Sequence, residues 1–371
     1  MMEYNWQAQR ERKAFLALAD GSIFHGYSVG YPADCTGEAV FNTGMTGYQE
    51  IITDPSYAGQ FVALTTAEVG NYGCNDEDVE SRDLFLNGLI VQEMNQASNY
   101  RSTQELTAVL QNHGKPALAG IDTRALTLLL RARGAQKAYL HASDEPLSED
   151  EAVARARTWE GLDGKDYASL VTTAQPYNWN TEGKFRVAVY DFGVKLNILR
   201  QLARHDIQVT VYPAKTPAAA ILATNPHGVF LSNGPADPSA VVYAQENIRA
   251  LLGKVPLMGI CLGHQLLGLS CGAECGRLKF GHHGCNHPVK DLRTGQVVIS
   301  SQNHNYALAN LPACLEQTHV NLNDHSCEGI RHRELPAFGI QYHPEAAPGP
   351  HDAQDIFADF LKMMEDEVNH A

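Results

Sequence analysis

The second half of the chain alternates short apolar segments with helical ones, and this alternation constrains the fold most. Strands are expected at residues 185–190, 207–212, 228–231 and 255–260, and helices at residues 194–205, 217–224, 240–252 and 263–271. Short buried strands separated by helices predict a parallel sheet with helices on both faces. After Cys275 the pattern predicts antiparallel strands instead, with candidates at residues 297–300 and 338–342.

Residues 1–150 are expected to form a β-rich domain. Strands at residues 13–18 and 22–29 flank Asp20-Gly21, a strong hairpin signal. Further strands are expected at residues 38–42, 61–66 and 88–91, and helices at residues 103–112 and 123–133. Asp122 is placed to cap the second helix and Gly134 to end it. Residues 151–184 are the expected connector, with a short helix at 151–158, and residues 185–371 are the second domain of an α/β protein.

The charge balance bears on partners and location. The chain has 28 basic and 42 acidic residues and a net charge of −14, which argues against nucleic acid and anionic membranes as partners. No stretch approaches the roughly 20 apolar residues of a membrane helix, and the N-terminus lacks the apolar core of a signal peptide. We therefore expect a cytoplasmic protein whose eight cysteines are reduced.

The segment Gly259-Ile260-Cys261-Leu262-Gly263 holds the strongest catalytic candidate. A strand enters it and a helix leaves it, with the cysteine at the junction and a glycine two residues to either side. This spacing is typical of a sharp turn that holds a nucleophile in a strained backbone conformation at a helix N-terminus. Taken alone, the segment is also compatible with a buried structural cysteine at a tight turn.

A nucleophilic cysteine needs a base, and His343 is the best candidate among 16 histidines. It lies in Tyr342-His343-Pro344-Glu345 at the end of an extended segment, where residues two apart project to the same side. Glu345 could therefore hold the His343 ring in the productive tautomer, as in other catalytic triads. His-Pro-Glu is a weak signal alone and a strong one beside the cysteine turn.

Residues 231–238, Leu-Ser-Asn-Gly-Pro-Ala-Asp-Pro, follow a predicted strand at the sheet edge where α/β proteins bind ligands. The simplest interpretation is an ordinary turn. The functional one is that the Gly234 and Leu262 N–H groups form an oxyanion hole.

Together, the cysteine turn, the Ser-Asn-Gly-Pro turn and His-Pro-Glu resemble a class I, triad-type glutamine amidotransferase domain over roughly residues 185–365. Residues 41–50 (FNTGMTGYQE) and 53–57 (TDPSY) resemble the signature of the carbamoyl phosphate synthetase small subunit. Further segments that match this family are residues 191–195, 281–284, 286–289 and 348–352. The resemblance spans nearly the whole chain.

The resemblance implies a set of contacts to the substrate glutamine: Gly44, Gly234, Ala236, Leu262, Gln265, Asn303, Asn305 and Tyr306. Two positions depart from the family pattern. Bacterial members often carry serine at position 44, and the family turn has glycine at position 236. Both departures bear on the affinity for glutamine rather than on the triad.

The implied activity is hydrolysis of glutamine to glutamate and ammonia by Cys261, His343 and Glu345. Ammonia would pass through a tunnel to a large synthetase subunit, which makes carbamoyl phosphate from bicarbonate and ATP. No cofactor is expected on this chain, since it lacks a G-x4-G-K-[ST] phosphate loop, so ATP and Mg are assigned to the partner. The alternatives are a glutaminase for another synthetase, disfavoured by residues 42–57, and a catalytically idle regulatory subunit.

A group near the cysteine turn has residue types that could bind zinc: Cys271, Cys275, Cys285, His282, His283 and His287. Its spacing fits no standard zinc finger. We expect no metal there and interpret the segment as a packed loop.

Overall fold

The computed structural model describes residues 10–235 and 237–370, and the chain divides into two compact units. Met1–Leu162 is the first unit and Asp163–Ala371 is the second. The division falls inside the expected connector. Its helix α5 (Glu149–Thr158) packs on strands of the first unit, and residues 163–184 belong to the second unit.

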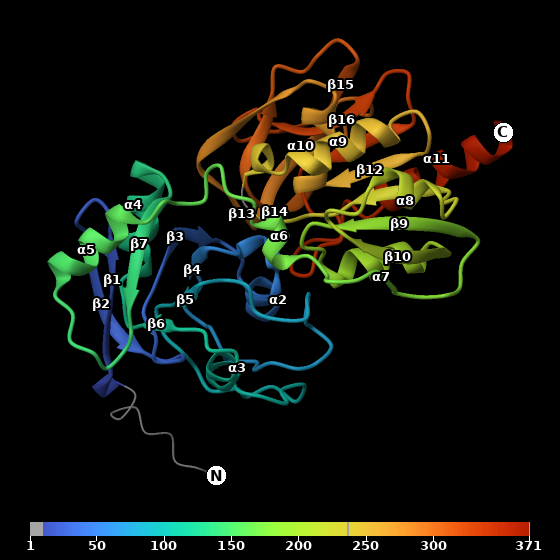
Figure 1. The fold of residues 1–371 in the computed structure, drawn as a ribbon. Coiled ribbons are helices and arrows are strands. Elements are labelled where there is room, and N and C mark those ends of the chain that lie inside the picture. Colours follow the sequence, from blue (N-terminus) through green and yellow to red (C-terminus); the bar gives the residue numbers. More distant parts are fainter. Residues whose placement is uncertain (1–9, 236, 371) are drawn as a thin grey trace. The chain divides into compact units, whose positions relative to one another are not determined.

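The first unit is built on a closed barrel with the strand order β1-β2-β6-β5-β4-β3-β7 (Figure 1). Its strands are β1 (Lys13–Leu18), β2 (Ile23–Ser28), β3 (Cys35–Asn42), β4 (Gln60–Leu64), β5 (Gly88–Ile90), β6 (Ala117–Ala119) and β7 (Gln136–His141). The strands β3, β4, β5 and β6 pair in parallel, whereas β1 pairs antiparallel with both β2 and β7. The expected hairpin at Asp20-Gly21 is confirmed.

Helices pack on the barrel of the first unit. Besides α5, they are α2 (Tyr48–Thr53), the 3₁₀ helix η1 (Pro55–Tyr57), α3 (Leu106–Asn112) and α4 (Thr123–Arg133). The bounds of α4 agree with the expected ones, and Asp122 caps it by accepting a hydrogen bond from the Ala125 N–H at 2.8 Å. Leu126 and Leu130 of α4 are fully buried in a core shared with alternate residues of β1 and β7.

The second unit contains a 10-stranded sheet with the order β14-β13-β15-β16-β17-β12-β11-β9-β10-β8. Its strands are β8 (Tyr177–Asn178), β9 (Phe185–Asp191), β10 (Ile207–Pro213), β11 (Gly228–Leu231), β12 (Leu257–Ile260), β13 (Glu274–Asp291), β14 (Val297–Ala309), β15 (Leu315–Asn321), β16 (Cys327–His332) and β17 (Ala337–Ile340). Five neighbouring strands of this sheet, β10, β9, β11, β12 and β17, pair in parallel, as the alternating pattern predicts.

Helices cover both faces of this parallel part (Figure 1). They are α6 (Ala168–Val171), α7 (Leu196–Arg204), α8 (Ala218–Leu222), η2 (Pro238–Ala240), α9 (Val242–Leu251), α10 (Leu262–Ser270) and α11 (Ile356–His370). Apolar residues of α8, α9 and α10 share one core with Ala188 and Tyr190 of β9. Those of α7 and α11 share another with Val187 and Val189. Since alternate residues of a strand face opposite sides, the two cores lie on opposite faces.

The antiparallel strands expected after Cys275 are confirmed for β13 to β16, but two details for the end of the chain differ from expectation. The strand expected at residues 338–342 is β17, and it pairs in parallel with β12 and antiparallel only with β16. The packed loop expected around residues 271–287 is largely the 18-residue strand β13, which pairs along its length with β14. Its polar, histidine-rich sequence and irregular register conceal the alternation that identifies a strand.

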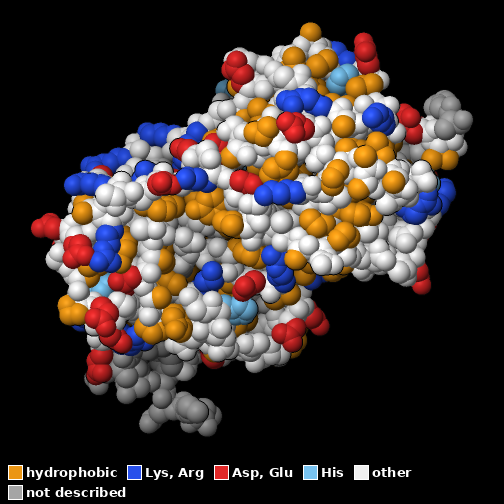
Figure 2. Space-filling view, in the orientation of Figure 1, with side chains coloured by type: hydrophobic (Ala, Val, Ile, Leu, Met, Phe, Trp, Pro, Cys, Tyr) orange, Lys and Arg blue, Asp and Glu red, His pale blue; other side chains and the backbone are white. Residues whose placement is uncertain are grey.

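No helix among residues 10–235 and 237–370 is long and apolar enough to cross a membrane. On the face drawn in Figure 2, Lys and Arg side chains are interspersed with Asp and Glu. None of the eight cysteines, all of which lie among the described residues, is in a disulfide.

Candidate active site

Cys261 lies at the junction of β12 and α10, in a strained backbone conformation. Its φ of 53° and ψ of −106° are unfavourable for a residue with a side chain. The flanking glycines are required by close packing. A Cβ atom at Gly259 would lie 2.5 Å from the Gly263 backbone, and one at Gly263 would lie 2.1 Å from the Leu231 carbonyl oxygen. The strained turn expected from the glycine spacing is therefore present.

The Cys261 side chain is buried, with 2% of its surface exposed. The Cys261 N–H donates to the Ile340 carbonyl of β17 at 2.9 Å, which fixes the turn against the neighbouring strand. The thiol points toward β14 and lies 3.5 Å from the Asn303 carbonyl oxygen. As the N-cap of α10, Cys261 also stands where the unpaired N–H groups and the dipole of a helix favour negative charge.

His343 and Glu345 form a tight buried pair just after β17. The His343 N–H donates to the Ser301 carbonyl of β14 at 2.8 Å, and the ring Nδ1 lies 2.6 Å from Glu345 Oε1. Within the described part of the chain, His343 Nε2 has no hydrogen-bond partner. Cys261 lies near enough to contribute to the raised pKa of His343. The structure thus brings the three predicted catalytic residues together.

The electrostatics of the pair favour an ionised carboxylate and a protonated ring. Burial by itself would lower the pKa of His343, but the negative charge of Glu345, followed by Cys261, outweighs it and raises the pKa to about 10. Burial would raise the pKa of Glu345, but Lys195 and then His343 lower it to about 2. Glu345 can therefore bind the proton on His343 Nδ1 and orient the ring so that Nε2 faces Cys261.

Lys195 completes this arrangement and was not among the predicted site residues. Its Nζ lies 3.0 Å from Glu345 Oε1 and donates to the Ala346 carbonyl at 2.7 Å. Both partners of the ion pair are almost fully buried. The signal that could have found Lys195 is its place in the family-like segment 191–195, directly after a strand of the parallel sheet.

The turn after β11 lies against the start of α10. The Ser232 carbonyl accepts a hydrogen bond from the Gly263 N–H at 3.0 Å. A Cβ atom at Gly234 would lie 2.2 Å from the Phe192 carbonyl oxygen and 2.8 Å from the Leu262 side chain. Gly234 and Leu262 are thus neighbours, as an oxyanion hole built from both would require. Ala236 lies outside the described residues, and its contact with glutamine stays a prediction.

The remaining predicted glutamine contacts of the second unit gather on α10 and β14. Gln265 Nε2 donates to the Tyr306 carbonyl at 2.8 Å and to Gln341 Oε1 at 3.0 Å. The side-chain oxygens of Asn303 and Asn305 lie 2.9 and 3.1 Å from the two ring nitrogens of His283. The Tyr306 hydroxyl donates to Asp163. These hydrogen bonds fix the side chains of the predicted residues. Their binding of glutamine stays a prediction.

Gly44 belongs to the first unit, between β3 and α2, where its N–H donates to Asn42 Oδ1 at 2.7 Å. Its role in glutamine binding also stays a prediction.

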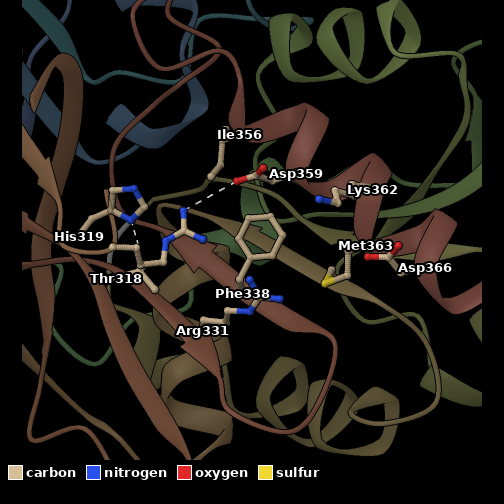
Figure 3. A pocket seen from close by; sticks show the side chains of 10 residues that line it. Thr318, His319, Arg331, Phe338, Ile356, Asp359, Lys362, Met363 and Asp366 are labelled. Carbon is tan, nitrogen blue, oxygen red and sulfur yellow. Dashed lines mark hydrogen bonds and ion pairs between the residues drawn. The ribbon is translucent and has the colours of Figure 1, made fainter. Parts of the chain in front are cut away.

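A pocket of about 280 Å³ in the second unit lies elsewhere, between α11 and the strands β15 to β17 (Figure 3). Arg293, Arg331 and Lys362 line it together with Asp359 and Asp366. It contains none of the predicted catalytic residues. Its charges of both signs single out no ligand, and it is not the candidate active site.

Comparison with known proteins agrees with this geometry. Residues 188–363 match the family model "Glutamine amidotransferase class-I". The second unit, with its cysteine turn and buried His–Glu pair, is therefore a class I glutamine amidotransferase domain. Residues 16–140 match a second family model, "Carbamoyl-phosphate synthase small chain, CPSase domain".

Curated relatives match over nearly the whole chain, and each of the following is called carbamoyl phosphate synthase small chain. The protein from Syntrophotalea carbinolica is 49% identical, covering 95% of this chain and 98% of that one. The protein from Chlorobaculum tepidum is also 49% identical, covering 96% and 99%. That from Escherichia coli K12 is 47% identical, covering 95% and 98%. The chain belongs to the family of carbamoyl phosphate synthase small chains and is the glutamine amidotransferase component of such a synthase.

Proposed function

We propose that this chain hydrolyses glutamine to glutamate and ammonia with Cys261 as nucleophile, His343 as acid and base, and Glu345 as the group that orients His343. The observation that carries the proposal is the arrangement of these three side chains. A strained cysteine at a helix N-terminus lies near an imidazole whose other nitrogen is held 2.6 Å from a buried carboxylate.

In the first half of the reaction, His343 Nε2 already holds the proton of Cys261, and the Cys261 thiolate attacks the side-chain amide carbon of glutamine. The N–H groups of Gly234 and Leu262 stabilise the negative oxygen of the tetrahedral intermediate. His343 then gives its proton to the departing nitrogen, and ammonia leaves a glutamyl thioester on Cys261.

In the second half, His343 takes a proton from water, and the resulting hydroxide attacks the thioester carbon. The intermediate collapses, glutamate is released, and the Cys261 thiolate and the protonated His343 are restored. The overall reaction consumes one glutamine and one water and yields one glutamate and one ammonia. Lys195 supports both halves because its charge keeps Glu345 ionised.

Ammonia would pass to a large synthetase subunit in a heteromeric complex that we place in the cytoplasm. The support is family membership together with the first unit, which matches the small-chain model. ATP and Mg would be bound by the large subunit, which would combine ammonia with bicarbonate to form carbamoyl phosphate.

The test uses the complex of this chain with its large subunit. Cys261→Ser should abolish glutamine-dependent synthesis of carbamoyl phosphate and leave ammonia-dependent synthesis intact. Cys327→Ser is the matched control, because Cys327 is a buried cysteine of β16 outside the triad. Loss of both activities in Cys261→Ser would indicate a structural cysteine. Absence of glutamine hydrolysis in the unmodified complex would indicate an idle regulatory subunit.

A further inference from the structure

Three buried side chains of the second unit converge behind β14. His282 of β13 pairs directly with His304 of β14, and Glu328 comes from β16. Each of the three offers a ligand atom, and these atoms lie within 4.8 Å of one another. The exposed fractions of the three residues are 6%, 5% and 0%, so water does not solvate the cluster from outside.

One ring nitrogen of His282 contacts a carboxylate, and the other has no hydrogen-bond partner among the described residues. Its Nε2 lies 2.9 Å from Asp324 Oδ2, which fixes the proton on that nitrogen. Its Nδ1 is buried, makes no hydrogen bond to the described residues, and lies 3.8 Å from Glu328 Oε1. A histidine oriented by a carboxylate on one side, with a lone pair on the other, is the arrangement found at metal ligands.

His304 also has one ring nitrogen that contacts a backbone carbonyl and one that faces the cluster. Its Nδ1 lies 2.7 Å from the Tyr306 carbonyl oxygen, so the proton is on Nδ1. With the proton on Nδ1, a neutral His304 ring has its lone pair on Nε2. This nitrogen lies 3.0 Å from Gln302 Oε1, while Gln302 Nε2 donates to Glu328 Oε2 at 3.0 Å. Two lone pairs thus face each other, and a cation would relieve their repulsion.

The fully buried carboxyl group of Glu328 accepts hydrogen bonds from neutral groups. Its oxygens accept hydrogen bonds from the amides of Asn321 and Gln302, at 2.8 and 3.0 Å, and both donors are neutral. A buried carboxylate of this kind is costly unless a positive charge compensates it.

We propose that His282 Nδ1, His304 Nε2 and the Glu328 carboxylate bind a divalent transition-metal ion of the zinc type. Two imidazoles and one carboxylate suit zinc, whereas calcium and magnesium prefer oxygen ligands throughout. Gln302 Oε1, beside His304 Nε2, is placed to be a fourth ligand. The set differs from the cysteine–histidine group considered from the sequence, because His304 and Glu328 join it only through strand pairing.

The ion would act as a structural clamp beside the active site. Gln302 and His304 project from one side of β14 toward the cluster, and Asn303 projects from the other. The backbone of the same strand supports the active site, through the Ser301 carbonyl on His343 and the Asn303 carbonyl on Cys261. Metal binding would therefore hold in place the strand on which both catalytic residues rest.

The first experiment measures zinc binding by the purified full-length chain after dialysis against a chelator. We expect about one zinc ion per chain in a competition titration against a chromophoric chelator. His282→Asn and Glu328→Gln should each weaken binding by about a hundredfold or more. His319→Asn is the matched control, because His319 is a buried histidine of β15 outside the cluster and should leave affinity unchanged.

A second measurement needs no variant and so does not depend on folding of the substituted chains. Cobalt(II) bound to the unmodified chain should give the visible bands of a tetrahedral nitrogen–oxygen site. A thiolate-to-cobalt charge-transfer band would place the metal on cysteine and overturn the proposal. Failure of the unmodified chain to bind zinc would also overturn it, and would indicate instead a proton on Glu328 with the Gln302 amide rotated.

Discussion

Replacing Lys195 by methionine tests the electrostatics of the candidate site. The substitution keeps an unbranched apolar stem but removes the charge 3.0 Å from Glu345 Oε1. Glu345 is fully buried, and Lys195 is the leading cause that lowers its pKa from 4.5 to about 2. Breaking a buried pair by removing one partner costs about 3–5 kcal/mol.

The dependence on pH follows from the direction of the shift. Because the pKa of Glu345 is lower in the folded chain, its stabilising contribution is present above about pH 4.5 and is lost as the pH falls toward 2. The difference between the unmodified chain and Lys195→Met should therefore be about 3 kcal/mol near pH 7 and should shrink in acid.

Urea unfolding at a series of pH values measures this difference. Lys184→Met is the control, because Lys184 is an exposed lysine whose ion pair with Glu365, at 3.6 Å, should contribute less than about 1 kcal/mol. Equal stability of Lys195→Met and Lys184→Met near pH 7 would refute the reasoning. So would a loss in Lys195→Met that persists unchanged in acid.

Three further predictions concern the site and the two units. His343→Asn should lower glutamine turnover by about 10²–10⁴-fold in a steady-state assay, and Glu345→Gln by less, whereas near-normal turnover of His343→Asn would exclude it as the base. Gly263→Ala places a Cβ atom 2.1 Å from backbone and should cost about 3 kcal/mol in urea unfolding. Gly276→Ala, with open space around it, should cost little, and equal losses would contradict the packing argument. Asp122→Ala should destabilise the first unit by about 1 kcal/mol in thermal unfolding, and no change would mean that the cap is not needed.

The sequence was most informative where local chemistry decides the structure. The bounds of α4 follow from a cap at Asp122 and an end at Gly134, and both signals are adjacent to the helix. The strained turn at Cys261 was predictable because small residues at 259 and 263 are needed wherever a strand turns so sharply into a helix. The His343–Glu345 contact was predicted from their spacing of two residues, although Pro344 and Glu345 form a turn after β17 and not extended chain.

Long-range contacts were the features that the sequence concealed. Lys195 reaches Glu345 across 150 positions, and no local pattern connects them. His282 and Glu328 meet only because β13 and β16 lie in one sheet, and β13 itself was missed because its polar residues do not alternate with apolar ones. The short helix α2 (Tyr48–Thr53) was also missed, since six residues are too few to show helical periodicity.

The most direct test of the central claim is detection of the glutamyl thioester. The unmodified chain, in complex with its large subunit, is mixed with glutamine, quenched in acid within the turnover time, digested and examined by mass spectrometry. We predict a glutamyl adduct on the peptide that contains Cys261, absent in Cys261→Ser and removed by hydroxylamine. An adduct on a different cysteine, or undiminished glutamine hydrolysis by Cys261→Ser, would contradict the assignment of Cys261 as the nucleophile.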